Sequence, residues 1–139
     1  MYGGVTYYFN EEYLRSAFDV VLEQTSQRNI SVAGILLVSP EGDAGELLKH
    51  PDFNGIAPYT MPNMTTMEST QCYAAALDFL AQRYSKPGMR IAHWIIHNEV
   101  DGGSHWTNMG DKPIATFMDT YLRSMRMCYN IVHLSLIHI

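Results

Sequence analysis

The sequence carries, at residues 30–38, the run ISVAGILLV, which is apolar at almost every position and has Gly34 in its middle. A run of this kind is typical of a strand that is covered on both faces, as in a parallel sheet. Pro40 ends it, because proline has no N–H to donate to a neighbouring strand. Two further runs rich in β-branched and aromatic residues, at 5–9 and 90–97, predict two more strands.

Helical patterns follow each of the three predicted strands. Asn10 precedes Glu11 and Glu12, which predicts an N-cap followed by an acidic first turn, and this first helix is expected to end near Arg28-Asn29. Its buried face is expected to hold four apolar residues that share one side of a helix: Leu14, Phe18, Val21 and Leu22.

The second and third helices have their own signals. Thr65 and Glu68 form a capping box at the start of the second, and Lys86-Pro87-Gly88 ends it. The third is expected to start near residues 111–113. Its predicted inner side carries a longer apolar set: Ile114, Phe117, Met118, Tyr121, Leu122, Met125 and Tyr129.

The order strand, helix, strand, helix, strand, helix predicts a parallel α/β fold with right-handed crossovers. In such folds the loops after the strands gather at one edge of the sheet, where ligand sites lie. The long loop at 39–65, which is rich in Gly, Pro, Asn and Asp and includes a possible helical turn at 45–48, is therefore expected to be functional.

Composition and charge narrow the classes of function. The 139 residues are 47% hydrophobic, which excludes a disordered chain, and they are too few for a complete parallel barrel of about 250 residues. The net charge of −5, without a basic stripe, argues against nucleic-acid binding, and no apolar run approaches the roughly 18 residues of a membrane span. No glycine-rich phosphate loop follows a strand, and Cys72 and Cys128 are expected to be buried free thiols.

The segment from His97 to Asn108, directly after the third predicted strand, holds two acids, two histidines, two asparagines and a tryptophan. At a strand end, a glutamate can protonate a glycosidic oxygen and then activate water, while a neighbouring asparagine binds the adjacent sugar hydroxyl. Glu99 and Asn98 have these residue types in this order.

The run Trp94-Ile95-Ile96-His97-Asn98-Glu99 resembles the fourth strand of the clan A glycoside hydrolases, (β/α)8 barrels in which an Asn-Glu pair ends that strand. The wider sequence, at residues 7–10, 59–65, 81–85 and 97–110, is similar to a bacterial family of glycosidase-like barrels whose substrate is undefined. The resemblance implies an α/β fold that is a partial TIM (β/α)8 barrel of about three parallel βα units, near strands two to four.

The resemblance also implies the roles of individual residues. Glu99 would be the catalytic acid/base, with no cofactor and a carbohydrate as substrate. Asn98 would orient the sugar by the same resemblance. Four further residues are expected to bind the sugar or shape its pocket because they belong to the same polar cluster: His97, Asp101, His105 and Trp106. Many clan members have Pro after the Glu, where this chain has Val100, so the shape of the following loop is not carried over. The clan's nucleophile belongs to the seventh strand, so the isolated chain is expected to be inactive.

Two segments are expected along the chain. Residues 1–133 would form the partial barrel, whereas residues 134–139 follow the third helix without a cap, glycine or proline and resemble a translated adapter sequence. We expect this tail to be foreign to the natural protein.

Other interpretations of the same residues stay open. Trp94 is expected to pack in the core, Trp106 could be exposed for stacking on a sugar, and Tyr59 and His50 are expected to be surface or packing residues.

His93, His97, Glu99 and His105 could form a metal-dependent hydrolase site, because alternate strand residues share a face. The chain could instead be a carbohydrate-binding barrel without catalysis, or a self-contained flavodoxin-like domain.

Overall fold

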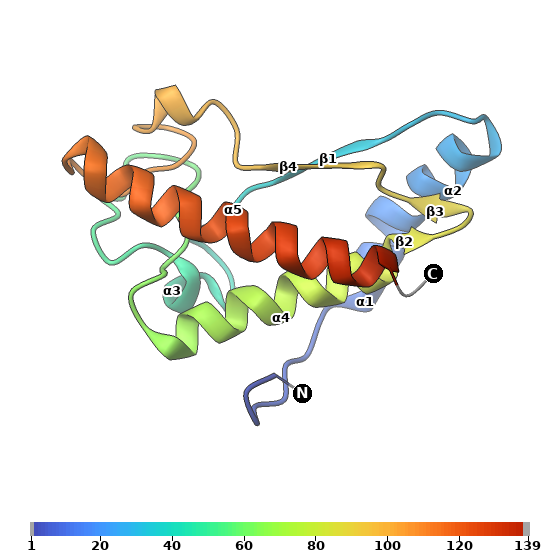
Figure 1. Ribbon diagram of the computed structural model, residues 1–139, viewed down its shortest axis with the longest axis horizontal. Coiled ribbons are helices and arrows are strands. Elements are labelled where there is room, and N and C mark those ends of the chain that lie inside the picture. Colours follow the sequence, from blue (N-terminus) through green and yellow to red (C-terminus); the bar gives the residue numbers. More distant parts are fainter. Residues whose placement is uncertain (1, 138–139) are drawn as a thin grey trace.

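The computed structural model describes residues 2–137, which form a mixed α/β structure around one parallel pair of strands (Figure 1). β1 (Ala33–Leu36) pairs with β4 (His93–Ile96) in parallel, with Gly34 opposite Trp94. The expected parallel arrangement of these two segments is therefore confirmed. The partial (β/α)8 barrel stays a prediction, because two strands do not define a barrel.

Two long helices cover one face of this sheet. α4 (Met67–Arg83) and α5 (Ile114–Ile137) lie side by side and run back against the direction of the strands (Figure 1). The core between helices and sheet is built from Val38, Met64, Tyr73, Leu77, Ala81, Cys128 and Val132, with Leu36, Trp94 and Ile96 packed against it. Trp94 thus has the packing role that the sequence favoured, and both cysteines are buried free thiols as expected.

The other face of the sheet is left uncovered by residues 2–137. Ile35 is 50% exposed and Ile95 is 42% exposed, while their neighbours Leu36 and Ile96 face the helices. The prediction that residues 30–38 are covered on both faces is therefore wrong for this structure. An apolar run indicates that both faces of a strand can be buried, but burial also needs a covering layer on each face. Here the helices supply that layer on one face only.

The first helical segment follows the predicted signals closely. Asn10 caps α1 (Glu11–Leu14) by accepting a hydrogen bond from the Tyr13 N–H, a π-helical turn spans Arg15–Asp19, and α2 (Val20–Gln27) ends before Arg28 and the left-handed Asn29. Asp19 anchors this segment to α4, because its carboxylate pairs with the Arg83 guanidinium at 2.6 Å. Of the expected apolar face, Leu22 is buried, whereas Phe18 and Val21 are about half exposed.

Residues 5–9 do not form the predicted strand. Tyr2 and Val5 close a turn through two backbone hydrogen bonds, and the Phe9 ring stacks on Phe79 of α4 at 4.0 Å. This segment therefore runs beneath α4 and makes no ladder with β1 (Figure 1). Its β-prone composition is outweighed by contacts of its aromatic side chains with a helix.

Smaller elements complete the description. α3 (Gly45–Leu48) forms the short turn expected within the long loop, and β2 (Ser85–Lys86) pairs with β3 (Met89–Arg90) in a hairpin around Pro87-Gly88. The cap of α4 is Thr66, whose side chain accepts from the Ser69 N–H, one residue later than the predicted Thr65. Thr65 donates instead to Asn63.

The buried face of α5 differs from the predicted one. Its buried residues are Thr120, Ser124, Cys128 and Val132, whereas Ile114 is 74% exposed and Tyr129 is 65% exposed. Small side chains on α5 and the alanines of α4 let the two helices approach closely, so several larger apolar residues stay outside. Of the predicted set, Phe117 and Tyr121 are half-buried, so apolar periodicity placed the inner face of this helix partly on the exposed side.

The expectation that residues 134–139 are foreign to the natural protein stays a prediction. α5 continues without a break through residues 134–137, and residues 138–139 of the expected foreign tail lie outside the described residues. Within residues 2–137, no helix combines the length and the apolar character needed to cross a membrane.

Candidate functional site

Two long loops meet at the carboxyl end of the sheet, one after β1 and one after β4 (Figure 1). They are joined at Thr60, which is completely buried. Its N–H donates to the Val38 carbonyl at 3.0 Å, and its hydroxyl lies 3.0 Å from the Asn108 carbonyl. The Met61 N–H donates to the same Asn108 carbonyl at 3.0 Å. This junction connects the end of β1 to the loop that carries the polar cluster.

Asn108 fixes the junction with its side chain. Its Oδ1 accepts from the backbone N–H groups of Asn54 and Gly110, each at 3.2 Å, and its Nδ2 donates to the Ser104 carbonyl at 2.9 Å. Gly110 has a φ of 69°, and a Cβ there would lie 2.6 Å from the Asp52 carbonyl oxygen, so a side chain would push the loops apart.

An ion pair and a buried histidine support the same junction. Lys112 pairs with Asp52 across the two loops at 3.0 Å. His50 is buried, and burial lowers the pKa of its imidazole, while its Nδ1 accepts from the Asp52 N–H at 3.2 Å. The packing role expected for His50 is therefore the one that the structure gives it. Thr60 had no sequence signal of its own, because its partners are distant in the chain.

The two loops also share an aromatic contact. Tyr59, from the loop after β1, stacks on Trp106, from the loop after β4, with ring centroids 5.5 Å apart and planes inclined by 15°. Both side chains are partly exposed. Stacked pairs of this kind hold their rings in a fixed orientation. Tyr59 thus belongs to the candidate site, although sequence analysis predicts only a surface or packing role for it.

The strand end departs from regular β geometry at two residues. His97 has a φ of 65° and Glu99 has a φ of 43°, both in the left-handed region, with Asn98 between them. A left-handed residue reverses the alternation of side chains along a strand. His97 therefore turns toward α5 and does not share a face with His93.

The His97 ring is 1% exposed and lies against α5. Its Nε2 is 2.8 Å from Ser124 Oγ, and its centroid is 5.7 Å from that of Tyr121. Burial lowers the pKa of the imidazole to about 4, so the ring is neutral at pH 7. His97 was expected to bind substrate, but in this structure its side chain supports the strand end from the helix side.

Glu99 and the remaining cluster residues lie on the loop surface. Glu99 is exposed and precedes a 3-10 turn, η2 (Val100–Gly102), which the Gly102 N–H closes by donating to the Glu99 carbonyl at 2.7 Å. A Cβ on Gly102 would lie 3.9 Å from Glu99 Cβ and 3.6 Å from Trp106 Cδ1, so both side chains lie close to Gly102. Asn98 is half-buried, and Asp101 and His105 are exposed.

Two negative findings concern the described part of the chain. No group of three or more His, Cys, Asp or Glu side chains there could hold a metal ion, so His93, His97, Glu99 and His105 do not converge as the metal interpretation requires. Three cavities among the described residues, of about 490, 540 and 230 Å³, are lined by residues other than Glu99 and Trp106.

These features define an α/β protein whose two parallel strands end in loops joined by a buried hydrogen-bond network and an aromatic stack. The chain belongs to a family of unknown function, DUF5722, whose sequence profile matches residues 1–136. No curated protein and no solved structure matches it. The match confirms membership of a family over nearly the whole chain, and it assigns no activity.

Proposed function

We propose that this chain carries the acid/base portion of a glycoside hydrolase that cleaves O-glycosidic bonds in a polysaccharide or oligosaccharide. The observation that carries the proposal is the position of Asn98 and Glu99 directly after β4, in a loop that is joined to the loop after β1. Ligand sites of parallel α/β folds lie at this edge of the sheet. The proposal includes the partial (β/α)8 barrel as its scaffold.

Each residue of the cluster has a role in the proposed reaction. Glu99 donates a proton to the leaving glycosidic oxygen and then accepts one from the attacking water, which is the work of a general acid/base. Asn98 hydrogen-bonds the sugar hydroxyl beside the reacting carbon, and Asp101 and His105 bind more distant hydroxyls. Trp106, which stacks on Tyr59 and lies close to Gly102 as Glu99 does, offers an apolar face to a sugar ring.

His97 acts through its neighbours in this proposal. Its neutral ring is fixed on Ser124 of α5, which holds the left-handed backbone that presents Asn98 and Glu99. The second carboxylate is proposed to lie in a part of the barrel outside this chain, about 5 to 5.5 Å from Glu99 if the reaction retains configuration. The chain by itself is therefore expected to bind sugar without turnover.

The test has a binding arm and a catalytic arm. For binding, the chain is titrated with cellohexaose and xylohexaose while tryptophan fluorescence is recorded, since Trp106 is partly exposed and Trp94 packs on the core. We expect a spectral change that Trp106→Phe abolishes and Glu99→Gln retains. For catalysis, Glu99→Gln in a longer chain that completes the barrel should lower turnover about 100-fold or more, whereas the remote Glu23→Gln should not. Full activity of the Glu99 variant would remove it from the mechanism.

A second candidate is a carbohydrate-binding barrel without catalysis. The stacked Tyr59–Trp106 pair favours it, because an aromatic platform binds a sugar ring whether or not a nucleophile is present. Only the catalytic arm of the test distinguishes the two candidates. Sugar binding that depends on Trp106, together with no turnover in a longer chain that completes the barrel, would support the non-catalytic binding protein.

A further inference from the structure

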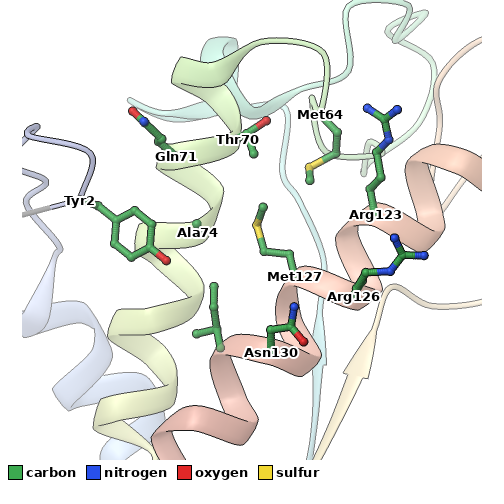
Figure 2. A pocket seen from close by; sticks show the side chains of 10 residues that line it. Tyr2, Met64, Thr70, Gln71, Ala74, Arg123, Arg126, Met127 and Asn130 are labelled. Atoms are coloured by element: carbon green, nitrogen blue, oxygen red, sulfur yellow. The ribbon is translucent and has the colours of Figure 1, made fainter.

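A groove lies between α4 and α5, away from the loops that carry Glu99 (Figure 2). Its volume is about 490 Å³, and it is formed by both helices together with the N-terminal segment and Met64 of the loop before α4. The lining residues are Tyr2, Met64, Thr70, Gln71, Ala74, Arg123, Arg126, Met127, Asn130 and Ile131.

The charged residues that line the groove are both arginines. Arg123 and Arg126 stand one turn apart on α5, with their guanidinium groups at the same end of the groove (Figure 2), and no Asp or Glu is among its lining residues. Arg123 pairs through Nε with Asp119 at 2.9 Å, which leaves its two terminal nitrogens as donors. Arg126 makes no ion pair with any residue between 2 and 137. In a chain of net charge −5, this is a local positive site.

The rest of the groove combines an apolar floor with neutral polar groups. Met127 reaches between the two helices toward Ala74, near Met64 (Figure 2). Ile131 also lines the groove and adds apolar surface. Thr70, Gln71 and Asn130 add hydroxyl and amide groups that can donate or accept hydrogen bonds. A ligand matched to the groove therefore carries an anionic group at one end and an apolar body.

The N-terminal segment supplies the remaining wall. Gly3 lies against α4 so closely that a Cβ there would meet the Gln71 side chain. The turn between Tyr2 and Val5, closed by hydrogen bonds of 2.9 and 3.0 Å, holds this contact in place. The Tyr2 ring consequently lies beside the groove, with its hydroxyl near the helices (Figure 2).

We propose that this groove binds a small organic anion, whose carboxylate, sulfate or phosphate group is held by Arg123 and Arg126 while its apolar body rests on Met127 and Ala74. Planar guanidinium groups bind the paired oxygens of such anions with two hydrogen bonds each. The site is separate from the loops of the proposed glycosidase and does not depend on that function.

The experiment titrates the whole chain with phenyl phosphate, inorganic phosphate and phenol, by calorimetry and by NMR chemical shifts. Phenyl phosphate should bind most tightly, because it alone uses both the arginines and the apolar floor. Arg126→Gln should raise its Kd about tenfold or more, as expected for losing charge-assisted hydrogen bonds. The matched control is Arg90→Gln, which removes an exposed arginine of β3 outside the groove and should leave the Kd unchanged.

The shifted resonances locate the site. Changes at Asn130 and Gln71, with none at Trp106, support the groove, whereas changes confined to the loop after β4 overturn it. Equal affinities for phenyl phosphate and inorganic phosphate would show attraction of charge alone and would also overturn the proposal, as would equal affinities for phenyl phosphate and phenol. Arg126 is exposed, so circular dichroism of its variant should match that of the parent chain.

Discussion

His97 Nε2 lies 2.8 Å from Ser124 Oγ and thereby connects the end of β4 to the middle of α5. The Ser124 hydroxyl also donates to the Tyr121 carbonyl at 2.8 Å, so the neutral His97 ring donates from Nε2. Its Nδ1 is buried without a hydrogen-bond partner among the described residues. The strand end that carries Asn98 and Glu99 is thus held from the helix layer.

Removing the serine hydroxyl should destabilise the fold. Ser124→Ala leaves the buried His97 Nε2–H without an acceptor, and an unpaired buried donor costs about 1 to 3 kcal/mol. Urea unfolding measures this loss. The matched control is Ser16→Ala, whose hydroxyl makes the same kind of bond to the Tyr13 carbonyl but is exposed and has no histidine partner. It should change the free energy of unfolding by no more than about 0.5 kcal/mol, and equal effects of the two variants would contradict the role of His97.

Stability should depend on pH through His97. Its pKa is about 4 in the folded chain and 6.5 when unperturbed, because burial disfavours the charged ring. Between these pH values the unfolded chain binds more protons than the folded chain does. The contribution of His97 to the free energy of unfolding is therefore complete above pH 6.5 and decreases as the pH drops toward 4. The contribution of His97 is up to about 3 kcal/mol. The lowered pKa of His50 acts in the same direction below pH 6.5.

Denaturant unfolding at several pH values between 4 and 7 tests this dependence. His97→Asn should reduce the slope and leave the part that comes from His50. An unchanged slope in this variant would show that His97 does not carry the effect.

The anchor between α2 and α4 should matter for stability. Asp19 is buried and accepts from Arg83 at 2.6 and 3.1 Å and from the Tyr84 hydroxyl at 3.1 Å, so Asp19→Ala leaves a largely buried guanidinium without its main partner. A loss of about 3 kcal/mol in the free energy of unfolding is expected. Glu11→Ala, which removes the exposed partner of the same arginine, should cost no more than about 1 kcal/mol.

The same carboxylate has its own pH window. Hydrogen bonds from Arg83 lower the pKa of Asp19 below its ordinary value of 3.8. Its contribution is therefore complete above about pH 4 and is lost as the pH falls through the lowered pKa, which separates it from the effect of His97. Acid unfolding below pH 4 should begin at higher pH in Asp19→Ala than in the parent chain; identical acid transitions would contradict this assignment.

Asn108 should control the opening of the two loops. Asn108→Ala removes the acceptor of the Asn54 and Gly110 N–H groups, and each lost bond of about 1 kcal/mol corresponds to about fivefold faster amide exchange. NMR-detected hydrogen exchange measures both amides. Asn54→Ala, which removes a bond within a single loop, should leave the Gly110 amide as slow as before. Unchanged exchange in Asn108→Ala would show that the loops are held by other contacts.

Local signals account for much of what could be predicted. The cap at Asn10, the end of α2 near Arg28, the turn at Gly45–Leu48 and the burial of both cysteines all follow from short sequence patterns. The cap of α4 was missed by one residue, since Thr65 and Thr66 offer the same side chain and their backbone geometry decides between them.

Other features could not be read from short patterns. Residues 5–9 do not form the predicted strand because the Phe9 ring stacks on Phe79 of α4. The buried face of α5 is the one with small residues because α4 packs against that face. No short pattern predicts the hydrogen bond between Thr60 and Asn108, because the two residues are 48 positions apart. The sequence places the candidate site at 97–108 and predicts a functional loop at 39–65, whereas the contacts that join the two loops, including the stack of Tyr59 on Trp106, are found only in the structure.

The sequence by itself determined where helices begin and end, the parallel order of β1 and β4, and the place of the polar cluster after a strand. The helix boundaries and the place of the cluster depend on backbone hydrogen bonds and side-chain periods within a few residues, and the parallel order follows from the helical connection between the two strands. Tertiary structure alone decided that His97 turns to Ser124, that Thr60 and Asn108 join the loops, and that Tyr59 stacks on Trp106. Such contacts depend on which distant segments pack together, because burial rewards the best fit of the whole chain over any local preference.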